Sequence, residues 1–271
     1  PRGEVPAAAG VVTCHVDVQG DRLEAAAKAW GPGEESWLVD WRVFHGDPHT
    51  ADPWEELDAW LLQGFQHQAS GRVMRPDITL VDSRFASDAV YDFVHPRQRG
   101  GRRVYAAAGV ERFDRPGLAK ESTGRKARVR LFLLATDAAK KRVAARLQIH
   151  APGPGFVHLP DWVTEEYLEQ LVSEKLVSHM DRKTRRVKHA WVKTRPRNEA
   201  LDLEVGCMAG LFILQAILLG GRYRDLEACA AAAARTDEDL AEERQKQAPP
   251  RPTARPRWAL PPGRSGILPG W

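Results

Sequence analysis

The sequence is poor in several features that mark particular classes of protein. Its 271 residues include three cysteines, far apart and without a C-x-x-C pair. This argues against a zinc ribbon or a disulfide framework and favours a reducing compartment. No G-x-x-x-x-G-K-[ST] motif occurs, so the sequence contains no P-loop nucleotide site. No signal peptide or internal repeat is visible. The longest apolar run, residues 207–221, is shorter than a bilayer requires and predicts a buried helix, so we expect no membrane partner.

Basic residues are clustered along the chain, although the formal net charge is only +4. The clusters are "GRKARVR" (124–130), "AKKR" (139–142) and "DRKTRRVKHAWVKTRPR" (181–197). Clustered Lys and Arg on an otherwise balanced protein indicate a polyanionic partner, with nucleic acid as the first candidate. The alternative is a set of solvated faces without a partner.

The order of apolar runs and turn signals predicts an α/β protein with a mixed sheet. The expected strands cover residues 11–19, 22–31, 36–44, 77–83 and 102–110, and the expected helices cover residues 52–65, 84–94, 162–176, 198–219 and 221–247. The first three strands form an antiparallel meander, and strand–helix alternation follows it. Residues 142–149 fit either a helix or a strand, and residues 183–194 alternate like a basic hairpin. We expect a main domain over 1–220, a C-terminal helix over 221–247 and a Pro/Arg-rich tail over 248–271 without a core of its own.

Three aspartates lie where a structural carboxylate is unusual. Asp17 interrupts the apolar run VVTCHVDV, Asp82 ends the run ITLVD, and Asp202 is embedded in an otherwise apolar helix. If the first strand is regular, Thr13, His15, Asp17 and Gln19 share one face. Carboxylates that converge on one point repel one another, and divalent cations remove that repulsion. Oxygen ligands without cysteine suit Mg²⁺ or Mn²⁺, and two such ions can activate a water and stabilise the departing oxygen of a phosphodiester.

Several motifs resemble, in the same order, the nuclease domain of large terminase subunits from lambda-like phages. The motifs are "VDVQGDRLE", "VDSRFASDAVYDFV", "RRVYAAAGV", "PGPGFVHLP", "EEYLEQLVSEK" and "RPRNEALDLEVGCMAG". The resemblance covers roughly residues 10–215. It implies a ribonuclease H-like fold, in which a mixed sheet is flanked by helices and acidic residues bind two metal ions. It also implies cleavage of concatemeric viral DNA in the host cell cytoplasm during virion assembly.

The resemblance also implies roles for individual residues. Asp17, Asp82 and Asp202 become the catalytic metal ligands, with Glu199 and His15 as possible auxiliaries. The basic residues expected near DNA are Arg84, Lys120, Arg125, Lys126 and Lys140. The sequence departs from the family pattern at two positions. Arg84 stands where a Gly is frequent, and Ala108 stands where a Lys is common, so a neighbouring basic residue would have to replace that Lys.

The wider context follows from the resemblance too. The missing initiator Met and the missing P-loop predict the C-terminal part of a longer terminase whose motor lies upstream. The expected partners are double-stranded DNA, the small terminase subunit and the portal protein. Two alternatives remain open: another ribonuclease H-like nuclease of the resolvase or transposase type, and a packaging adaptor that binds DNA and portal without cutting.

Overall fold

The computed structural model describes residues 1–110, 117–122, 129–180, 185, 187–218 and 223–247. Two compact units are present, residues 1–236 and residues 237–271. The described part of the second unit is one helix, α7 (Asp237–Gln247). The first unit contains the central sheet and the site described below.

The central sheet is mixed and has the strand order β11-β4-β3-β2-β7-β8-β10-β9. Its strands are β2 (Val11–Val18), β3 (Arg22–Trp30), β4 (Ser36–His45), β7 (Ile78–Asp82), β8 (Val104–Val110), β9 (Ala119–Glu121), β10 (Leu131–Ala135) and β11 (Val157–His158). β2, β3 and β4 form an antiparallel meander, whereas β7, β8 and β10 run parallel to β2. The expected mixed sheet, with a meander leading into parallel strands, is confirmed.

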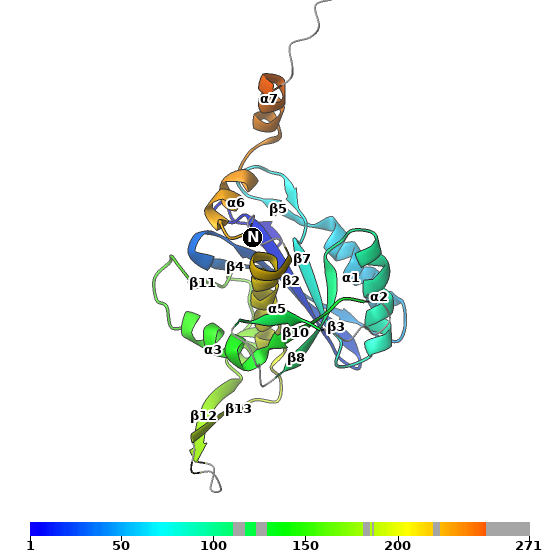
Figure 1. Ribbon diagram of the computed structural model, residues 1–271, viewed down its shortest axis with the longest axis vertical. Coiled ribbons are helices and arrows are strands. Elements are labelled where there is room, and N and C mark those ends of the chain that lie inside the picture. Colours follow the sequence, from blue (N-terminus) through cyan, green and yellow to red (C-terminus); the bar gives the residue numbers. More distant parts are fainter. Residues whose placement is uncertain (111–116, 123–128, 181–184, 186, 219–222, 248–271) are drawn as a thin grey trace, which may run out of the picture. The chain divides into compact units, whose positions relative to one another are not determined.

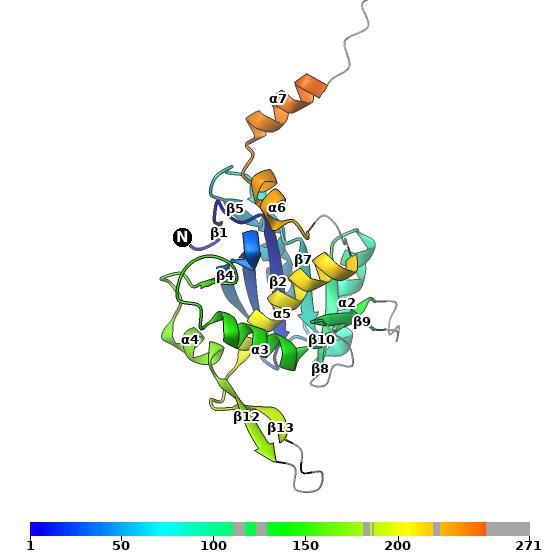
Figure 2. The same cartoon turned by 60° about the vertical axis from the view of Figure 1, so that its left-hand side comes forward.

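Helices cover both faces of this sheet, as Figures 1 and 2 show. On one face, α1 (Asp52–Gln63) and α2 (Ser87–Arg99) pack on the Val12, Cys14 and Val16 side of β2. On the other face lie α3 (Thr136–Arg146), α4 (Glu165–Leu171) and α5 (Glu199–Ile213). Because β2 is sandwiched between these layers, all eight of its residues are buried. A carboxylate on β2 therefore lies under a helix and not in solvent.

The long apolar helix is the main element of the second face. α5 continues into a π-helical turn, η2 (Leu214–Leu218), and the combined segment is long and apolar enough to cross a bilayer by length and composition alone. Its packing accounts for this composition, since residues from Ala200 to Leu214 join the core formed with β2, β3 and β7. Apolar side chains that face a sheet contribute roughly 25 cal/mol per Å² of buried area.

Smaller elements complete the first unit. They are β1 (Glu4–Val5), β5 (Phe65–His67) and β6 (Val73–Met74), which form a small sheet, the turn η1 (Pro32–Glu34), and α6 (Leu226–Ala233). A two-stranded antiparallel ribbon is formed by β12 (Glu174–Met180) and β13 (Val187–Lys193). In both views this ribbon extends away from the central sheet (Figures 1 and 2).

Three expected elements differ from the structure. The helix predicted over 162–176 is wrong at both ends, because α4 covers only Glu165–Leu171 and residues 174–180 pair with 187–193 as strand β12. The basic hairpin predicted at 183–194 is accordingly one strand of a longer ribbon. The ambiguous stretch 142–149 is helical as far as Arg146. The single helix predicted over 221–247 is two helices, α6 and α7, because three acidic residues at positions 237–239 favour a new helix N-terminus there. The tail 248–271 lies outside the described residues.

Candidate active site

A pocket of about 250 Å³ lies at the carboxyl ends of β2 and β7, beside the start of α5. It brings together the three aspartates singled out in the sequence: Asp17 on β2, Asp82 at the end of β7 and Asp202 in the first turn of α5. The remaining lining residues are His15, Arg84, Ala107, Gly109, Leu134, Thr136, Lys140 and Val205. The common face predicted for Thr13, His15 and Asp17 is the face under α5.

Asp17 is buried, with 7% of its surface exposed, and it has little to balance its charge. Within the described part of the chain, its hydrogen-bond donor is the Gln19 side-chain amide, 2.5 Å from Oδ2. Burial raises the pKa of Asp17 to about 7; the Gln19 hydrogen bond opposes this shift, whereas Asp202 and Asp82 add to it. A carboxyl in this state takes up either a proton or a cation.

The other two acids share this electrostatic environment. Burial raises the pKa of Asp82, against a hydrogen bond of 3.1 Å that the Arg84 backbone N–H donates to its Oδ1. Burial also raises the pKa of Asp202 to about 6, where Lys140 lowers it and Glu174 raises it. Three carboxyls with raised pKa values therefore line one pocket, where Arg84 and Lys140 offset only part of the effect of burial on Asp82 and Asp202.

Asp202 is held in place by Lys140 and by two residues that the sequence did not single out, Asn198 and Glu174. Asn198 Nδ2 donates to Asp202 Oδ2 at 2.7 Å and to Glu174 Oε1 at 2.9 Å. Lys140 Nζ lies 2.8 Å from both Glu174 oxygens and 3.6 Å from Asp202 Oδ1. Glu174 was assigned to a helix in the sequence, which hid its role as the first residue of the ribbon. The Asn immediately before the helix "EALD" was a signal that could have been used.

His15 is a packed, neutral imidazole beneath the acids. Its ring lies against the backbone of α5 at Gly206, where an added Cβ would come within 2.0 Å of the ring. Burial lowers the pKa of His15 to about 4, although a hydrogen bond to the Leu80 backbone opposes the shift. His15 therefore lines the pocket and carries one buried polar atom, Nδ1, that has no hydrogen-bond partner among the described residues.

The expected auxiliary Glu199 is engaged elsewhere. Its carboxylate accepts hydrogen bonds from Arg22 at 3.1 Å and from Arg197 at 3.3 Å. Both arginines also bind Glu24, the residue of β3 that lies opposite Asp17 in the backbone pairing of β2 and β3. Glu199 does not line the pocket. This network fixes the start of α5 to β3, so Glu199 supports the site without presenting a free oxygen to it.

Of the basic residues expected near DNA, three lie in the described part of the chain, and two of these line the pocket. Arg84 and Lys140 line it. Lys120 belongs to the edge strand β9 and is absent from the lining. Arg125 and Lys126 lie outside the described residues. Thr136 and Gly109 occupy the wall of the pocket near Ala108, the position where the family pattern has a Lys.

The donor set fits a hard divalent cation. Asp17, Asp82 and Asp202 offer carboxylate oxygens from three different elements, and the pKa values that burial raises are those of groups a bound cation would return to the charged form. Among the described residues, however, no three Asp, Glu, His or Cys side chains form a ready-made ligand cluster. The residues present are therefore suited to Mg²⁺ or Mn²⁺ in kind, while their assignment as ligands stays a prediction.

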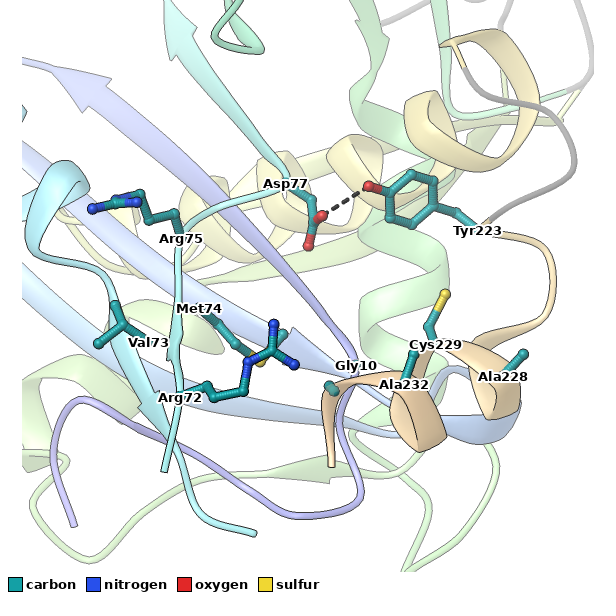
Figure 3. Close-up of a pocket in the computed structure, with 11 residues that line it drawn as sticks. Gly10, Arg72, Val73, Met74, Arg75, Asp77, Tyr223, Ala228, Cys229 and Ala232 are labelled. Atoms are coloured by element: carbon teal, nitrogen blue, oxygen red, sulfur yellow. Dashed lines mark hydrogen bonds between the residues drawn. The ribbon is translucent and has the colours of Figure 1, made fainter. Parts of the chain in front are cut away.

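A second and larger pocket, of about 390 Å³, lies at the opposite end of the same strands (Figure 3). Asp77 precedes β7 there, and its Oδ1 accepts from the Tyr223 hydroxyl at 2.8 Å while its Oδ2 accepts from the Val12 backbone N–H at 2.9 Å. Arg72 and Arg75 also line this pocket. A single satisfied carboxylate beside two arginines does not suit a divalent cation, so the three-aspartate pocket is the candidate active site.

Comparison with known proteins shows which family the chain resembles. The chain is 29% identical over 217 residues to the terminase large subunit of Enterobacteria phage P21, and 28% identical over 216 residues to that of Escherichia phage lambda. These matches cover 76% and 77% of this chain and 33% of each relative, so the chain spans a third of their length. A solved structure of T. thermophilus RuvC in complex with Holliday junction substrate matches 76% of this chain and 95% of that one, at 14% identity. The TM-score of this match is 0.32.

The family described as "Terminase large subunit gpA, endonuclease domain" matches residues 1–218, which include the whole central sheet, the ribbon and all three aspartates. The chain belongs to this family of terminase endonuclease domains.

Proposed function

We propose that this chain is a metal-dependent endodeoxyribonuclease domain that cuts concatemeric phage DNA for packaging. The observation that carries the proposal is the convergence of Asp17, Asp82 and Asp202 on one pocket, where burial raises the pKa of each carboxyl. The terminase large subunits that it resembles support viral DNA as the substrate. Because the chain spans only a third of those relatives, its role within a whole terminase is part of the proposal.

The three aspartates would hold two divalent cations. When bound, Mg²⁺ or Mn²⁺ supplies Lewis-acid activation of water and stabilises charge on the departing oxygen. The protein supplies the oxygen donors and, by burying Asp17 under α5, an environment in which electrostatic interactions are strong. His15 stays neutral beneath them and adds no competing positive charge. Arg84 and Lys140 at the wall of the pocket are placed to attract the phosphate backbone.

The β12–β13 ribbon extends the basic surface beyond the pocket. In the sequence, residues 174–197 carry nine Lys or Arg residues against two acidic ones. Charge of this kind binds phosphates without reading bases, so we propose weak sequence preference and strong salt dependence of DNA binding. Site selection would then depend on the small terminase subunit, and docking on the portal protein, in the host cell cytoplasm.

Incubation of the chain with supercoiled plasmid tests this proposal. Nicked and linear products should form with Mg²⁺ or Mn²⁺ and disappear with EDTA. Asp82→Asn should abolish cleavage, whereas the matched variant Asp77→Asn, at the opposite end of the same strand, should retain it. Both variants are compared with the wild type by thermal melting, so that unfolding is not mistaken for loss of chemistry. DNA binding without metal-dependent cleavage would favour the packaging adaptor, and cleavage that survives Asp82→Asn would refute the assigned ligands.

A further inference from the structure

The buried amide of Asn198 joins three parts of the molecule. Its Oδ1 accepts from Lys193 Nζ at 2.6 Å, and its Nδ2 donates to Glu174 Oε1 at 2.9 Å and to Asp202 Oδ2 at 2.7 Å. Glu174 is the first residue of β12 and Lys193 is the last residue of β13, and they pair with each other across the ribbon. One side chain therefore contacts both ends of the ribbon and one of the candidate metal ligands.

The chemistry of these contacts fixes the orientation of the amide. An ammonium group can only donate, and a carboxylate can only accept. The Asn198 oxygen must therefore face Lys193, and its NH₂ group must face Glu174 and Asp202. The opposite orientation would place the amide oxygen against two carboxylates. Any movement of the ribbon base that displaces Lys193 or Glu174 removes a contact that orients Asn198.

The Asn198 side chain does not make the capping hydrogen bond that is common for an asparagine in its position. Asn198 immediately precedes α5 and occupies the N-cap position, where an Asn side chain commonly accepts from a backbone N–H of the first helical turn. Here it makes no such bond. A capping bond is worth about 1 kcal/mol, so its absence indicates that the contacts to the ribbon and Asp202 are favoured instead.

Lys140 forms a second connection between the base of the ribbon and Asp202. Lys140 Nζ on α3 contacts both Glu174 oxygens at 2.8 Å and lies 3.6 Å from Asp202 Oδ1. The ribbon base is also closed by the backbone, since the Thr194 N–H donates to the Ser173 carbonyl at 2.7 Å. The ribbon is consequently fixed to the pocket at its base, while its far end extends away from the sheet (Figure 2).

We infer that Asn198 is a positioning residue that couples the ribbon to Asp202, so that DNA bound along the ribbon and divalent cations bound in the pocket strengthen each other's binding. This inference rests on the proposed nuclease function. DNA that holds the ribbon in place also holds Lys193 and Glu174, and through Asn198 it holds the Asp202 carboxylate in one orientation. A pre-oriented ligand loses less conformational freedom when a cation binds, and thermodynamic linkage makes the effect reciprocal.

The test measures the affinity of the chain for a 25-base-pair duplex, by fluorescence anisotropy, with EDTA and with Ca²⁺. Ca²⁺ takes oxygen ligands and replaces Mg²⁺, and gels verify that the duplex stays intact. We expect Ca²⁺ to tighten DNA binding by the wild type by about tenfold, within the range common for coupled sites. Asn198→Ala should reduce this gain to about twofold or less, while binding in EDTA stays within about twofold of the wild type, because Asn198 carries no charge.

A matched pair of ribbon variants separates this coupling from simple charge attraction. Lys193→Gln and Lys175→Gln each remove one positive charge from the ribbon and should weaken DNA binding in EDTA equally. Lys175 follows Glu174 in β12 and therefore faces the other side of the ribbon, away from Asn198. We expect Lys175→Gln to keep the tenfold gain from Ca²⁺ and Lys193→Gln to lose most of it. A Ca²⁺ gain that is equal in both variants would overturn the inference.

The two proposals fail in different ways. If the wild type neither cuts plasmid nor responds to divalent cations, the proposed function fails. If the wild type cuts and responds, and Asn198→Ala and Lys193→Gln respond equally well, only the coupling fails. Should Asn198→Ala melt at a much lower temperature, the comparison of Lys193→Gln with Lys175→Gln decides alone.

Discussion

Removing the Asp17 carboxylate should stabilise the metal-free protein while destroying its activity. Asp17 lies on β2, the first strand of the meander, under α5, where a hydrogen bond from Gln19 does little to offset its burial. The substitution Asp17→Asn retains the shape and an oxygen that can accept from Gln19, but it removes the charge. Residues that evolution keeps against stability are typical of functional sites, because activity requires the group that folding disfavours.

The size and pH dependence of this effect follow from the pKa of Asp17. The pKa is about 7 in the folded state and near 3.8 in the unfolded chain, so the folded state binds more protons between these values. Stability therefore falls as the pH rises through this window, by about 4 kcal/mol in full. At pH 5 less than half of the loss has occurred. Asp17→Asn should accordingly gain roughly 2–4 kcal/mol at pH 8 and clearly less at pH 5.

Urea or thermal unfolding in EDTA at the two pH values measures this gain, and about 3 kcal/mol corresponds to roughly 6–12 °C for a chain of this size. Asp40→Asn is the matched control. Asp40 is also a buried aspartate within a strand, but Arg2, Arg42 and the Trp60 indole N–H all donate to it, so its substitution should destabilise the protein. Destabilisation by Asp17→Asn at pH 8, or an equal gain at both pH values, would refute the account of the pocket.

Three further predictions follow from the same geometry. Mn²⁺ should raise the melting temperature of the wild type, and the rise should be larger at pH 8 than at pH 5.5, because the raised pKa values of Asp17 and Asp202 make protons compete with the metal; a rise that is independent of pH would contradict this. Glu199→Gln should keep metal-dependent cleavage within about threefold and lose roughly 1–3 kcal/mol of stability, since Glu199 is buried and pairs with two arginines outside the pocket lining; loss of metal-dependent stabilisation would restore its role as a ligand. Gly206→Ala should lower the melting temperature strongly, at a cost of roughly 3 kcal/mol or more, because the new methyl group would overlap the His15 ring; combining it with His15→Ala should recover part of the loss.

The sequence predicted the first half of the fold well because its signals are local. Alternation in VVTCHVDV and the turn residues after it specify the meander, and the structure has β2 and β3 where they were expected. The face shared by Thr13, His15 and Asp17 also follows from the period of a strand alone. It could be predicted without knowing that α5 covers this face.

The second half was predicted less well because its strands depend on distant partners. Residues 162–176 have the apolar spacing of a helix, and nothing near Glu174 indicates a strand. The strand forms because seven residues of β12 pair with seven residues of β13, beyond a connection at positions 181–186. The contacts of Glu174 with Lys140 and Asn198 are likewise products of the tertiary structure, so no local pattern could have shown them.

Asp17 in the candidate site has no positively charged partner among the described residues. This property follows from the fold and not from the residue type. Asp17 and Asp40 look alike in the sequence, as single acids inside apolar strands, and both are buried. Asp40 meets Arg2 and Trp60, which come from the N-terminus and from α1, so its charge is balanced. Asp17 meets Asp82 and Asp202, which raise its pKa further. The same difference separates the two ends of β7, where Asp77 is satisfied by Tyr223 and Asp82 is left in the shared pocket. A buried acid without a positive partner, such as Asp17, is stabilised by a proton or a cation, and the nearby carboxyls of Asp82 and Asp202 favour a divalent cation at neutral pH.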